Sequence, residues 1–574
     1  MLPHLREPGQ GPGVASHITG DLGTRTPDRA GQIDLSRSSR RRRPARATLR
    51  GVVGGSDVPG GRREWSRRAG RPVWLWPTLL TLVVASTGVG YAQPWRDELA
   101  TWSAATRPLP DLARLAATVD ATVAPYYLLL HGWVAVFGDS VTALRAPSVL
   151  AVTGAAGLTA VLGERLFGTR AGRLGGLLFS VLPSTSRYGQ EARPYALATL
   201  LAVAATVLLV TALRRPGRGR WTAYAAVVTA LGLTHLVALA LLAAHALAVR
   251  GAVRRWLLAL VPAALVAVPL ALLARRQQSR QLSWVDPARL GDLAGLPGSL
   301  TASAVVGGLL VGLAVVGAAR PVDSTPAETD VARPVDGGRA DDDSGPADAG
   351  AASSGSGGGP ARTPVARKWG WIMLAAVAAP AALLFVAGLV TAVWVPRYLV
   401  FTTPFLCLPA GALLASVRPV PALAVVGITA ALGAPAQLDL RRTHDWPRSA
   451  QVDYRAAARI VAAGQRPGDG VVYGSRDGFL FLDLGLAYHL GDGRPRDVLA
   501  VRDPRRAGDL RATECERPAR CLAGVDRVWL VVAGDRADPV AALPTVKREA
   551  LDGFSPTGRW TVPGITVALL ARAG

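Results

Sequence analysis

Two adjacent carboxylates, Asp97 and Glu98, follow directly after the first long apolar run of the chain, residues 73–92. Trp95 and Trp102 flank the pair, and tryptophan is typical of the boundary between a bilayer and water. A carboxylate at this depth can act as a general base that takes a proton from a hydroxyl group near lipid headgroups. The plainer alternative is the solvated end of a helix with interfacial tryptophans.

The apolar runs predict a polytopic α-helical membrane protein. Of the 574 residues 50% are hydrophobic and only 18% are charged, and the mean hydropathy is +0.27. Each run is near the ~20 residues that cross a bilayer as a helix, and we expect about eleven such helices. The net charge of +24 comes mostly from arginines in the N-terminal tail and in short loops. That is the positive-inside bias, so no nucleic-acid partner is expected.

Changes in composition divide the chain into five parts. These are a basic, disordered cytosolic tail (1–71), a first membrane part (72–319) with an external loop (93–142), an acidic, disordered cytosolic linker (320–368), a second membrane part (369–436) and an extracytoplasmic domain (437–574). The tail lacks the apolar region of a signal peptide, so the first apolar run is an anchor with its N-terminus inside. An odd number of spans then leaves the last part outside.

Residues 437–574 predict a small α/β domain. Asp453 can cap a helix over 454–463, and short apolar runs at 470–474, 525–533 and 565–570 indicate strands. Cys515 and Cys521 in this domain either form a disulfide or remain free thiols. In the external loop, two amphipathic pieces (109–119 and 125–137) favour interfacial or re-entrant helices. A second external loop is expected over 275–297.

Several arginines lie on the outer side against the charge bias: Arg96, Arg193, Arg397 and the group Arg275, Arg276 and Arg280. A guanidinium group binds phosphate oxygens in a bidentate way, so a membrane-anchored phosphate suits these positions. Carboxylates and cations at one interface can displace a lipid phosphate: the base deprotonates an acceptor hydroxyl and the cations stabilise the leaving group.

Each of these residues also has a structural interpretation. Arg193 can pair with Glu191 or Glu98, and Arg397 can simply extend its side chain to the interface. The group at 275–280 fits a solvated loop, and His131 and His235 fit helix ends. The sequence has no paired ligand spacing typical of zinc.

The segments around these residues resemble glycosyltransferase family 39. They are Asp97-Glu98, Pro125-Tyr126-Tyr127-Leu128-Leu129-Leu130-His131, Phe137-Gly138-Asp139-Ser140, Leu144-Arg145-Ala146-Pro147-Ser148, Tyr188 to Leu197 with Gln190-Glu191-Ala192-Arg193-Pro194-Tyr195, and Arg397-Tyr398-Leu399. The family holds the dolichyl-phosphate-mannose protein mannosyltransferases and bacterial relatives such as the aminoarabinose transferases. The resemblance covers most of residues 72–435 and continues into 453–459. Relatives commonly carry His-Pro where this chain has Val123 and Ala124.

The resemblance implies a membrane enzyme of the GT-C fold that uses a polyprenyl-phosphate sugar. It implies that Asp97 is the base or binds the acceptor and that Glu98 supports it. Arg193, Arg397, Tyr195 and Tyr398 would bind the donor phosphate, and Tyr126, Tyr127, Gln190 and Glu191 would position the donor or acceptor. A divalent metal ion is left open as a cofactor.

We therefore expect an inverting glycosyltransferase of the cell envelope that transfers a sugar on the outer face of the plasma membrane. By family analogy the sugar is mannose, with a pentose as the alternative, and the acceptor is a protein, a glycolipid or a glycan. The composition, rich in Ala, Arg and Gly, favours a GC-rich bacterium and a carrier such as decaprenyl phosphate. The alternative is a non-catalytic scaffold or lipid-carrier transporter, but a transporter tends to have ionisable residues near mid-membrane.

Overall fold

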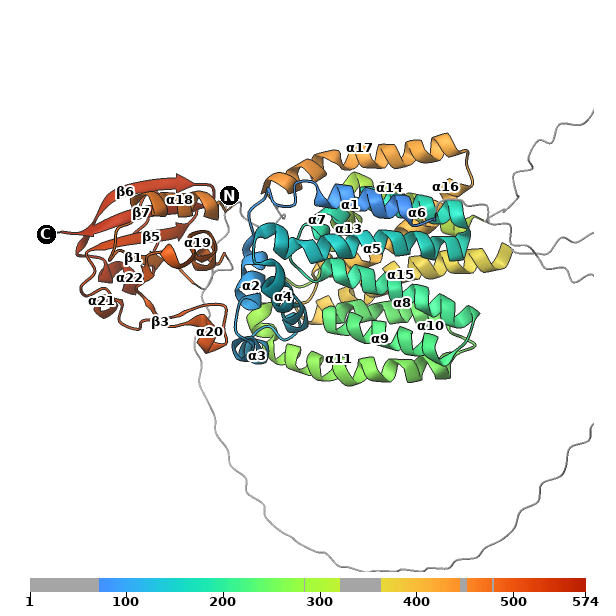
Figure 1. Cartoon of the computed structure of the whole chain (residues 1–574), viewed down its shortest axis with the longest axis horizontal. Helices are drawn as coiled ribbons and strands as arrows, with labels where there is room; N and C mark the ends of the chain where they lie inside the picture. Colours follow the sequence, from blue (N-terminus) through green and yellow to red (C-terminus); the bar gives the residue numbers. More distant parts are fainter. Residues whose placement is uncertain (1–71, 283, 321–362, 444–451, 477–479, 574) are drawn as a thin grey trace, which may run out of the picture. The chain divides into compact units, whose positions relative to one another are not determined.

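The computed structural model describes residues 72–282, 284–320, 363–443, 452–476 and 480–573 (Figure 1). The predicted basic tail (1–71) and residues 321–362 of the predicted acidic linker (320–368) lie outside the described residues. The prediction of disorder is wrong for residues 363–368, which form the start of helix α15 (Thr363–Val390). The described chain has a membrane part, which is mostly helical, and a C-terminal α/β part, as the sequence predicts.

In the described part of the chain, six helical segments are long and apolar enough to cross a bilayer. They are α5 (Val141–Phe167), α8 (Tyr195–Arg214), α11 (Val253–Gln281), α15 (Thr363–Val390), the pair η2 (Pro396–Thr402) and α16 (Thr403–Ala415), and α17 (Pro419–Thr443). Shorter apolar helices accompany them: α1 (Leu75–Ser86), α4 (Ala124–Phe137), η1 (Leu236–Leu241) with α10 (Leu242–Ala248), and α14 (Ala304–Ala319). Between these lie α6 (Thr169–Val181), α7 (Pro183–Gly189) and α9 (Arg218–Thr234). Each predicted apolar run coincides with a helix, whereas the count of eleven spans stays a prediction.

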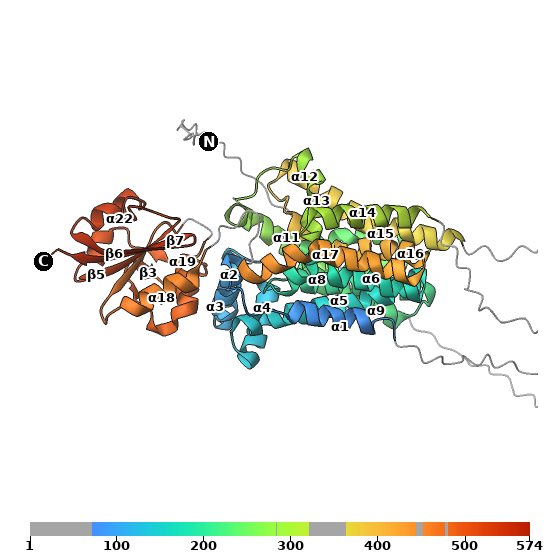
Figure 2. The ribbon, with the colours of Figure 1, turned by 90° about the horizontal axis from the view of Figure 1, so that it is seen from above.

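Glycines allow the helices at the centre of the membrane part to approach closely. A Cβ atom on Gly163 of α5 would lie 2.6 Å from the Cα of Gly172 in α6. A Cβ on Gly411 of α16 would lie 2.5 Å from the backbone nitrogen of Gly175 in α6. Small residues drive helix association in lipid because backbones can then make dense van der Waals contact. Figures 1 and 2 show α5, α6 and α16 running alongside one another.

The predicted external loop contains three helices: α2 (Arg96–Ala105), α3 (Leu109–Thr118) and α4. The two amphipathic pieces of the sequence correspond to α3 and α4. The backbone nitrogen of Trp95 donates a hydrogen bond of 3.4 Å to the carboxylate of Glu98, which closes the first turn of α2. Leu112, Leu115, Tyr126 and Leu130 pack together as the apolar cluster beneath these helices. The acidic pair therefore lies on a short helix that rests on a packed apolar cluster.

The predicted external loop at 275–297 is wrong in its first part, because α11 continues to Gln281. Two polar side chains of this last stretch, Gln277 and Gln281, form hydrogen bonds to residues 116–121. Gln277 is buried, donates to the carbonyl of Ala116 and accepts from the backbone nitrogen of Ala121, both at 2.9 Å. Two short helices, α12 (Leu290–Ala294) and α13 (Leu296–Thr301), follow.

The C-terminal part has a five-stranded mixed sheet in the order β2-β1-β5-β7-β6. β1 (Gly470–Tyr473) is parallel to β2 (Arg496–Asp497) and to β5 (Arg527–Ala533), whereas β7 (Ile565–Arg572) is antiparallel to β5 and to β6 (Phe554–Val562). A small second sheet pairs β3 (Ala500–Arg502) with β4 (Thr513–Glu514). The helical elements are α18 (Tyr454–Gly464), α19 (Leu482–Leu490), η3 (Gly491–Gly493), α20 (Pro504–Ala507), α21 (Pro518–Cys521) and α22 (Thr545–Ala550).

The predicted helix and three strands of this part are confirmed as α18, β1, β5 and β7. Asp453 caps α18, because its carboxylate accepts the backbone N–H of Ala456 at 2.9 Å. Cys515 and Cys521 form a disulfide, which decides between the two alternatives left by the sequence. Cys407 is a buried free thiol in α16.

Direct contacts connect the C-terminal part to the residues that flank α2. Arg107, just after α2, is fully buried and donates to the carbonyl oxygens of Asp509, at 2.7 Å, and of Pro504, at 3.4 Å. Gln93 donates to the carbonyl of Val452 at 3.2 Å and accepts the backbone N–H of Arg455 at 2.9 Å. The helix that carries the acidic pair is therefore held from both the membrane side and the C-terminal side.

Candidate functional site

Asp97 lies in the first turn of α2, between two arginines. Its Oδ2 atom is 3.5 Å from Nη2 of Arg397, at the start of η2, and its Oδ1 atom is 3.7 Å from Nε of Arg96. The side chain of Asp97 is 18% exposed, against 6% for Arg397. A carboxylate that is paired at a distance longer than a hydrogen bond and partly exposed can still accept a proton from a bound hydroxyl.

The electrostatic surroundings keep Asp97 ionised. Burial by itself raises the pKa of the Asp97 carboxyl, but the positive charges of Arg397, Arg193, Arg96 and Arg187 outweigh it and hold the pKa below its ordinary value of 3.8. Asp97 is therefore a carboxylate at neutral pH, in the protonation state that a base requires.

Glu98 has different surroundings from Asp97, although the two are adjacent. It is 1% exposed, and both of its oxygens accept hydrogen bonds from Arg145, at 2.6 and 2.8 Å. Glu98 also accepts the backbone N–H of Ala192 at 2.8 Å. Arg145 in turn donates to the carbonyl of Val89 at 2.7 Å and of Ala92 at 2.9 Å. The carboxylate thus fastens α2 to α5 and to the segment that precedes α8.

Four buried nitrogen atoms around Asp97 have no hydrogen-bond partner among the described residues: Nε1 of Trp95 and Nε of Arg96, Arg193 and Arg397. The indole ring of Trp95 lies between cations, since the guanidinium carbons of Arg187 and Arg397 are 5.3 and 5.9 Å from its centroid. Buried donors are normally paired, so a group of unpaired donors indicates that something else accepts from them. Cationic donors of this kind suit an anion with several oxygen atoms.

The segment 190–194 holds three of the predicted site residues in different roles. Gln190 donates to the carbonyl oxygens of Ala85 and Thr87, at 2.8 and 2.7 Å, and so ties the segment to the end of α1. Glu191 pairs with Arg187 at 3.6 Å. Arg193 reaches the hydroxyl of Thr101 in α2 at 3.5 Å. Neither Glu98 nor Glu191 has its ion pair with Arg193, because Glu98 pairs with Arg145 and Glu191 with Arg187. The charge of Arg193 instead interacts with that of Asp97.

Burial has a strong effect on Glu191. It raises the pKa of this carboxyl from 4.5 to about 7, with the neighbouring Glu98 and Asp97 adding to the shift and Arg187 and Arg397 opposing it. Glu191 is therefore a group whose charge changes near neutral pH, beside the arginines that surround Asp97.

A cavity of about 520 Å³ begins beside Arg193 and extends between helices of the membrane part. Tyr195, Tyr398 and His235 line one end of it, with ring centroids 5.4 to 6.3 Å apart. The remaining wall is largely apolar and includes Ala271 and Ala274 of α11 and Leu282, which follows this helix. Arg275 also lines the cavity, whereas Arg276 and Arg280 are exposed on the same helix and are not part of its lining. One end of the cavity is thus cationic and aromatic, and the body accepts apolar chains.

Tyr126 and Tyr127 are both buried in α4 and belong to the apolar cluster beneath α2. The hydroxyl of Tyr127 donates to Asp120 at 2.5 Å, and Gln281 donates to the other oxygen of Asp120 at 2.7 Å. His131 contacts the carbonyl of Ala105 through Nδ1 at 2.9 Å, as a helix-bound histidine does. No group of metal-ligating side chains is found in the described ranges.

Sequence reasoning missed several residues of this site. Arg187, Trp284 and Asp120 were not selected, although Arg187 precedes the Gln-Glu-Ala-Arg-Pro-Tyr segment by three residues. The guanidinium carbon of Arg397 is 5.2 Å from the ring centroid of Trp284. A helical spacing of four between Arg187 and Glu191 was the available signal for that pair. Nothing in the local sequence indicates Trp284.

The chain is similar to known proteins in one segment of its sequence and in its fold. Residues 122–275 match the family model described as dolichyl-phosphate-mannose-protein mannosyltransferase. The crystal structure of ArnT from Cupriavidus metallidurans bound to undecaprenyl phosphate is similar to this chain, with a TM-score of 0.55 and 14% sequence identity, over 87% of this chain and 98% of that one. The structure of the same protein in the apo state gives a TM-score of 0.53 and 14% identity, over 86% and 97%. No curated protein sequence matches the chain.

At 14% identity the solved structures establish the fold, and the family match covers a segment that contains Arg193, Tyr195 and the lining residues Ala271, Ala274 and Arg275. Both agree with the resemblance that the sequence suggested. The chain has a polytopic helical membrane fold similar to that of ArnT, and its residues 122–275 are similar to the dolichyl-phosphate-mannose-protein mannosyltransferase family.

Proposed function

We propose that this chain transfers a sugar from a polyprenyl-phosphate carrier to an acceptor hydroxyl group, with inversion at the anomeric carbon. The observation that carries the proposal is the set of four buried donor nitrogens around Asp97 that lack a hydrogen bond among the described residues. Three of them belong to arginines, which suits a phosphate, and they surround a carboxylate that is ionised at neutral pH. The transfer needs a phosphate-binding group and a base next to each other, and this arrangement offers both.

In the proposed reaction the acceptor hydroxyl gives its proton to Asp97, and its oxygen attacks the anomeric carbon of the donor sugar. The bond between that carbon and the phosphate oxygen breaks, and the polyprenyl phosphate leaves with the electron pair. Arg193 and Arg397 stabilise the negative charge that grows on the leaving phosphate. Attack from the side opposite the phosphate inverts the configuration. Tyr195 and Tyr398 contact the donor at the mouth of the cavity.

Glu98 acts in this proposal as a positioning residue and not as a second base. Both of its oxygens are occupied by Arg145, and it is 1% exposed. Its hydrogen bond from the backbone of Ala192 places the segment that carries Arg193 next to α2. Tyr126, Tyr127, Gln190 and Glu191 likewise support the site through packing and through the contacts described above.

The relatives support the choice of carrier and sugar. The matched family is described by its use of dolichyl-phosphate-mannose, and the ArnT structure was solved with undecaprenyl phosphate bound. Both carriers are polyprenyl phosphates, whose isoprenoid chain fits the apolar body of the 520 Å³ cavity. We take mannose as the sugar. The Cys515–Cys521 disulfide supports an extracytoplasmic face for the C-terminal part, since disulfides persist in oxidising compartments.

The test compares wild-type protein with Asp97→Asn in membranes that contain labelled polyprenyl-phosphate-mannose. We expect Asp97→Asn to lower transfer by about 10²- to 10⁴-fold, because the amide cannot accept the proton. Asp111→Asn is the matched control: Asp111 is an acidic residue of the neighbouring α3 that pairs with the exposed Arg114, and we expect its replacement to leave transfer unchanged. Full activity of Asp97→Asn would refute the base role. Absence of wild-type transfer from both mannose and pentose donors would refute the proposed function.

A further inference from the structure

The C-terminal part contains a cavity of its own, about 200 Å³ in volume, at the carboxyl ends of β1 and β5. Tyr473 and Gly474 line it from the end of β1, and Val532 and Ala533 line it from the end of β5. These two strands are parallel to each other. In the sheet, β2 is the neighbour of β1 on one side and β5 is its neighbour on the other side. The cavity therefore lies at a point where the strand order reverses, which is where sheets of this kind bind ligands.

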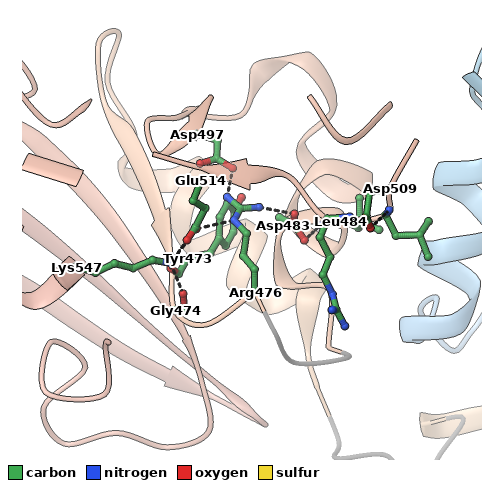
Figure 3. A network of polar contacts seen from close by, with 11 residues as sticks. Tyr473, Gly474, Arg476, Asp483, Leu484, Asp497, Asp509, Glu514 and Lys547 are labelled. Carbon is green, nitrogen blue, oxygen red and sulfur yellow. Dashed lines mark hydrogen bonds and ion pairs between the residues drawn. The ribbon is translucent and has the colours of Figure 1, made fainter. Parts of the chain in front are cut away.

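The polar wall of this cavity is fixed by a network of charges (Figure 3). Arg476 contacts three carboxylates, those of Asp483 at 2.6 Å, Glu514 at 2.7 Å and Asp497. Lys547 joins Glu514 at 2.7 Å and donates to the carbonyl oxygens that end β1. Asp483 lines the cavity with a side chain that is 19% exposed, so it keeps a face toward a ligand. Groups held in this way are ordered before a ligand arrives.

The charged groups of this cavity are of both signs. Arg476, Arg511 and Arg536 line it together with Asp483, whereas Asp497, Glu514 and Lys547 belong to the network but not to the lining. A fixed carboxylate beside a fixed guanidinium offers an acceptor and several donors, which can bind neighbouring hydroxyl groups of one ring. Ser475 and the exposed Arg536 at the mouth add further polar groups.

The lining also includes the apolar residues Phe481, Leu482 and Val532. Phe481 has φ 50° and ψ 52°, a left-handed conformation that is costly for an aromatic residue. A lining that combines aromatic and aliphatic side chains with hydrogen-bonding ones matches a sugar ring, which has an apolar C–H face and a rim of hydroxyl groups. The volume is below the ~300–1,000 Å³ of sites for drug-sized ligands, and so suits a single ring.

The cavity adjoins the helix that carries Asp97. Phe481 packs against the apolar cluster of α2 and α4 as well as against the core of its own domain. The hydroxyl of Tyr454 donates to the carbonyl of Leu480, which also lines the cavity, and Tyr454 packs with Leu99 of α2. The packing of α19 on α2 therefore connects the cavity to the helix that carries Asp97.

We propose that this cavity is a binding subsite for one sugar ring of a glycan acceptor, which it presents to the transfer site. The role of that glycan as acceptor rests on the proposed function, whereas sugar binding by the cavity stands separately. The acceptor class is accordingly a carbohydrate and not a protein side chain.

The first experiment measures sugar binding without a donor. Full-length protein in lipid nanodiscs free of glycoside detergent is mixed with methyl glycosides of mannose, arabinose and N-acetylglucosamine, and binding is detected by saturation-transfer NMR. Ala542→Trp places a large side chain at the exposed mouth of the cavity, and Ala541→Trp is the matched control at the adjacent exposed residue outside the lining. We expect at least one glycoside to bind, and Ala542→Trp to weaken that binding by about tenfold while Ala541→Trp leaves it unchanged.

Asp483→Asn tests the polar wall, with Asp492→Asn in the exposed η3 as its control. We expect Asp483→Asn to weaken the same binding, because one acceptor oxygen is lost. Lack of binding by every glycoside, equal binding by Ala542→Trp and wild type, or displacement of the glycoside by inorganic phosphate would each overturn the proposal.

The second experiment separates this inference from the proposed function. Donor breakdown by water reports on Asp97 and the arginines and needs no acceptor, so we expect Ala542→Trp to leave it unchanged and to raise the KM for a glycan acceptor. Glycoside binding in a protein without any transfer activity would refute the proposed function and keep the sugar subsite. An unchanged acceptor KM in Ala542→Trp would refute the subsite and keep the proposed function.

Discussion

The carboxylate of Asp97 and the guanidinium of Arg397 lie 3.5 Å apart and join α2 to η2, the 3₁₀ turn that opens α16. The contact combines an external helix from the beginning of the membrane part with a residue from its end. Because the proposed base and a proposed phosphate ligand hold each other in place, a change at either residue acts on both steps of the transfer.

Replacing Arg397 or Arg193 by Lys keeps the positive charge and removes the planar, bidentate donor group. We expect kcat/KM for the donor to fall by about 10- to 100-fold, because a point charge cannot reproduce two parallel hydrogen bonds to a phosphate. The measurement is initial-rate kinetics with varied donor. Arg276→Lys, on the exposed side of α11, is the control and should keep wild-type kinetics. Unchanged donor kinetics in Arg193→Lys would exclude its phosphate contact.

The buried Glu98 and Arg145 should each stabilise the protein only while the other is present. Replacing either residue by Ala leaves an unpaired charge, with an expected cost of about 3–5 kcal/mol in the free energy of unfolding. The double replacement should cost less than the sum of the two single ones, because neither charge then remains unpaired. Denaturant unfolding in detergent micelles measures all three variants, and Glu164→Ala at the other end of α5 is the control. Additive costs would mean that the pair is not coupled.

Donor binding should depend on pH through Glu191. Burial raises the pKa of this carboxyl to about 7, so the group is neutral at lower pH and becomes negative as the pH rises through that value. The new negative charge opposes a phosphate bound by Arg397 and Arg193, and the donor KM should therefore rise across neutral pH. Glu191→Gln should remove this dependence, whereas Glu164→Gln should retain it. A rise in KM that persists in Glu191→Gln would assign it to another group.

The same shift has a defined sign for stability. The folded-state pKa of Glu191 lies above the ordinary value of 4.5, so the protonated form favours the folded state. Its contribution is complete below 4.5 and is lost as the pH rises through about 7. Thermal unfolding of wild type relative to Glu191→Gln, followed across this range, should show the difference in Tm changing between these two pH values and levelling off outside them. A difference in Tm that stays constant across the range would contradict the shift.

Close packing of α6 against α16 gives a prediction about the membrane fold. A Cβ atom at Gly411 would lie 2.5 Å from the backbone nitrogen of Gly175 and 2.6 Å from the carbonyl oxygen of Ala171. We expect Gly411→Ala to destabilise the protein by about 1–3 kcal/mol, because backbone atoms cannot move away as a flexible side chain does. Gly427→Ala on α17, where nothing lies within 4 Å of the added carbon, is the matched control. Equal thermal stability of both variants would contradict this packing.

Most of the fold could be predicted from apolar patterns. The long apolar runs predicted membrane helices, α5 and α15 among them, and the short apolar runs of the C-terminal part predicted β1, β5 and β7. Helix ends were harder to place. The polar residues after Leu273 suggested a loop, but Gln277 is satisfied by the backbone of the external segment, and α11 continues to Gln281. Only tertiary contacts supply that information.

The sequence predicted which charged residues belong to the candidate site, but not which of them pair with one another. Asp97, Arg193 and Arg397 could be selected because charged residues at membrane interfaces need partners. Nothing in the local sequence distinguishes Asp97 from Glu98, and only the fold shows that Arg145 occupies the second carboxylate. The cavity of the C-terminal part was not predicted either, because its walls come from β1, β5 and α19, which are separated in the sequence and meet in the sheet.

Arg107 contacts the C-terminal part through main-chain oxygen atoms of residues 504 and 509 and not through their side chains. A contact to the backbone is insensitive to the identity of the residues that provide it, as long as the loop keeps its path. The C-terminal part can therefore accumulate substitutions in this loop during evolution, and even acquire a new acceptor preference, without losing its attachment to the helix that carries Asp97. Natural selection can therefore change the acceptor specificity of the C-terminal part while it keeps the transfer site.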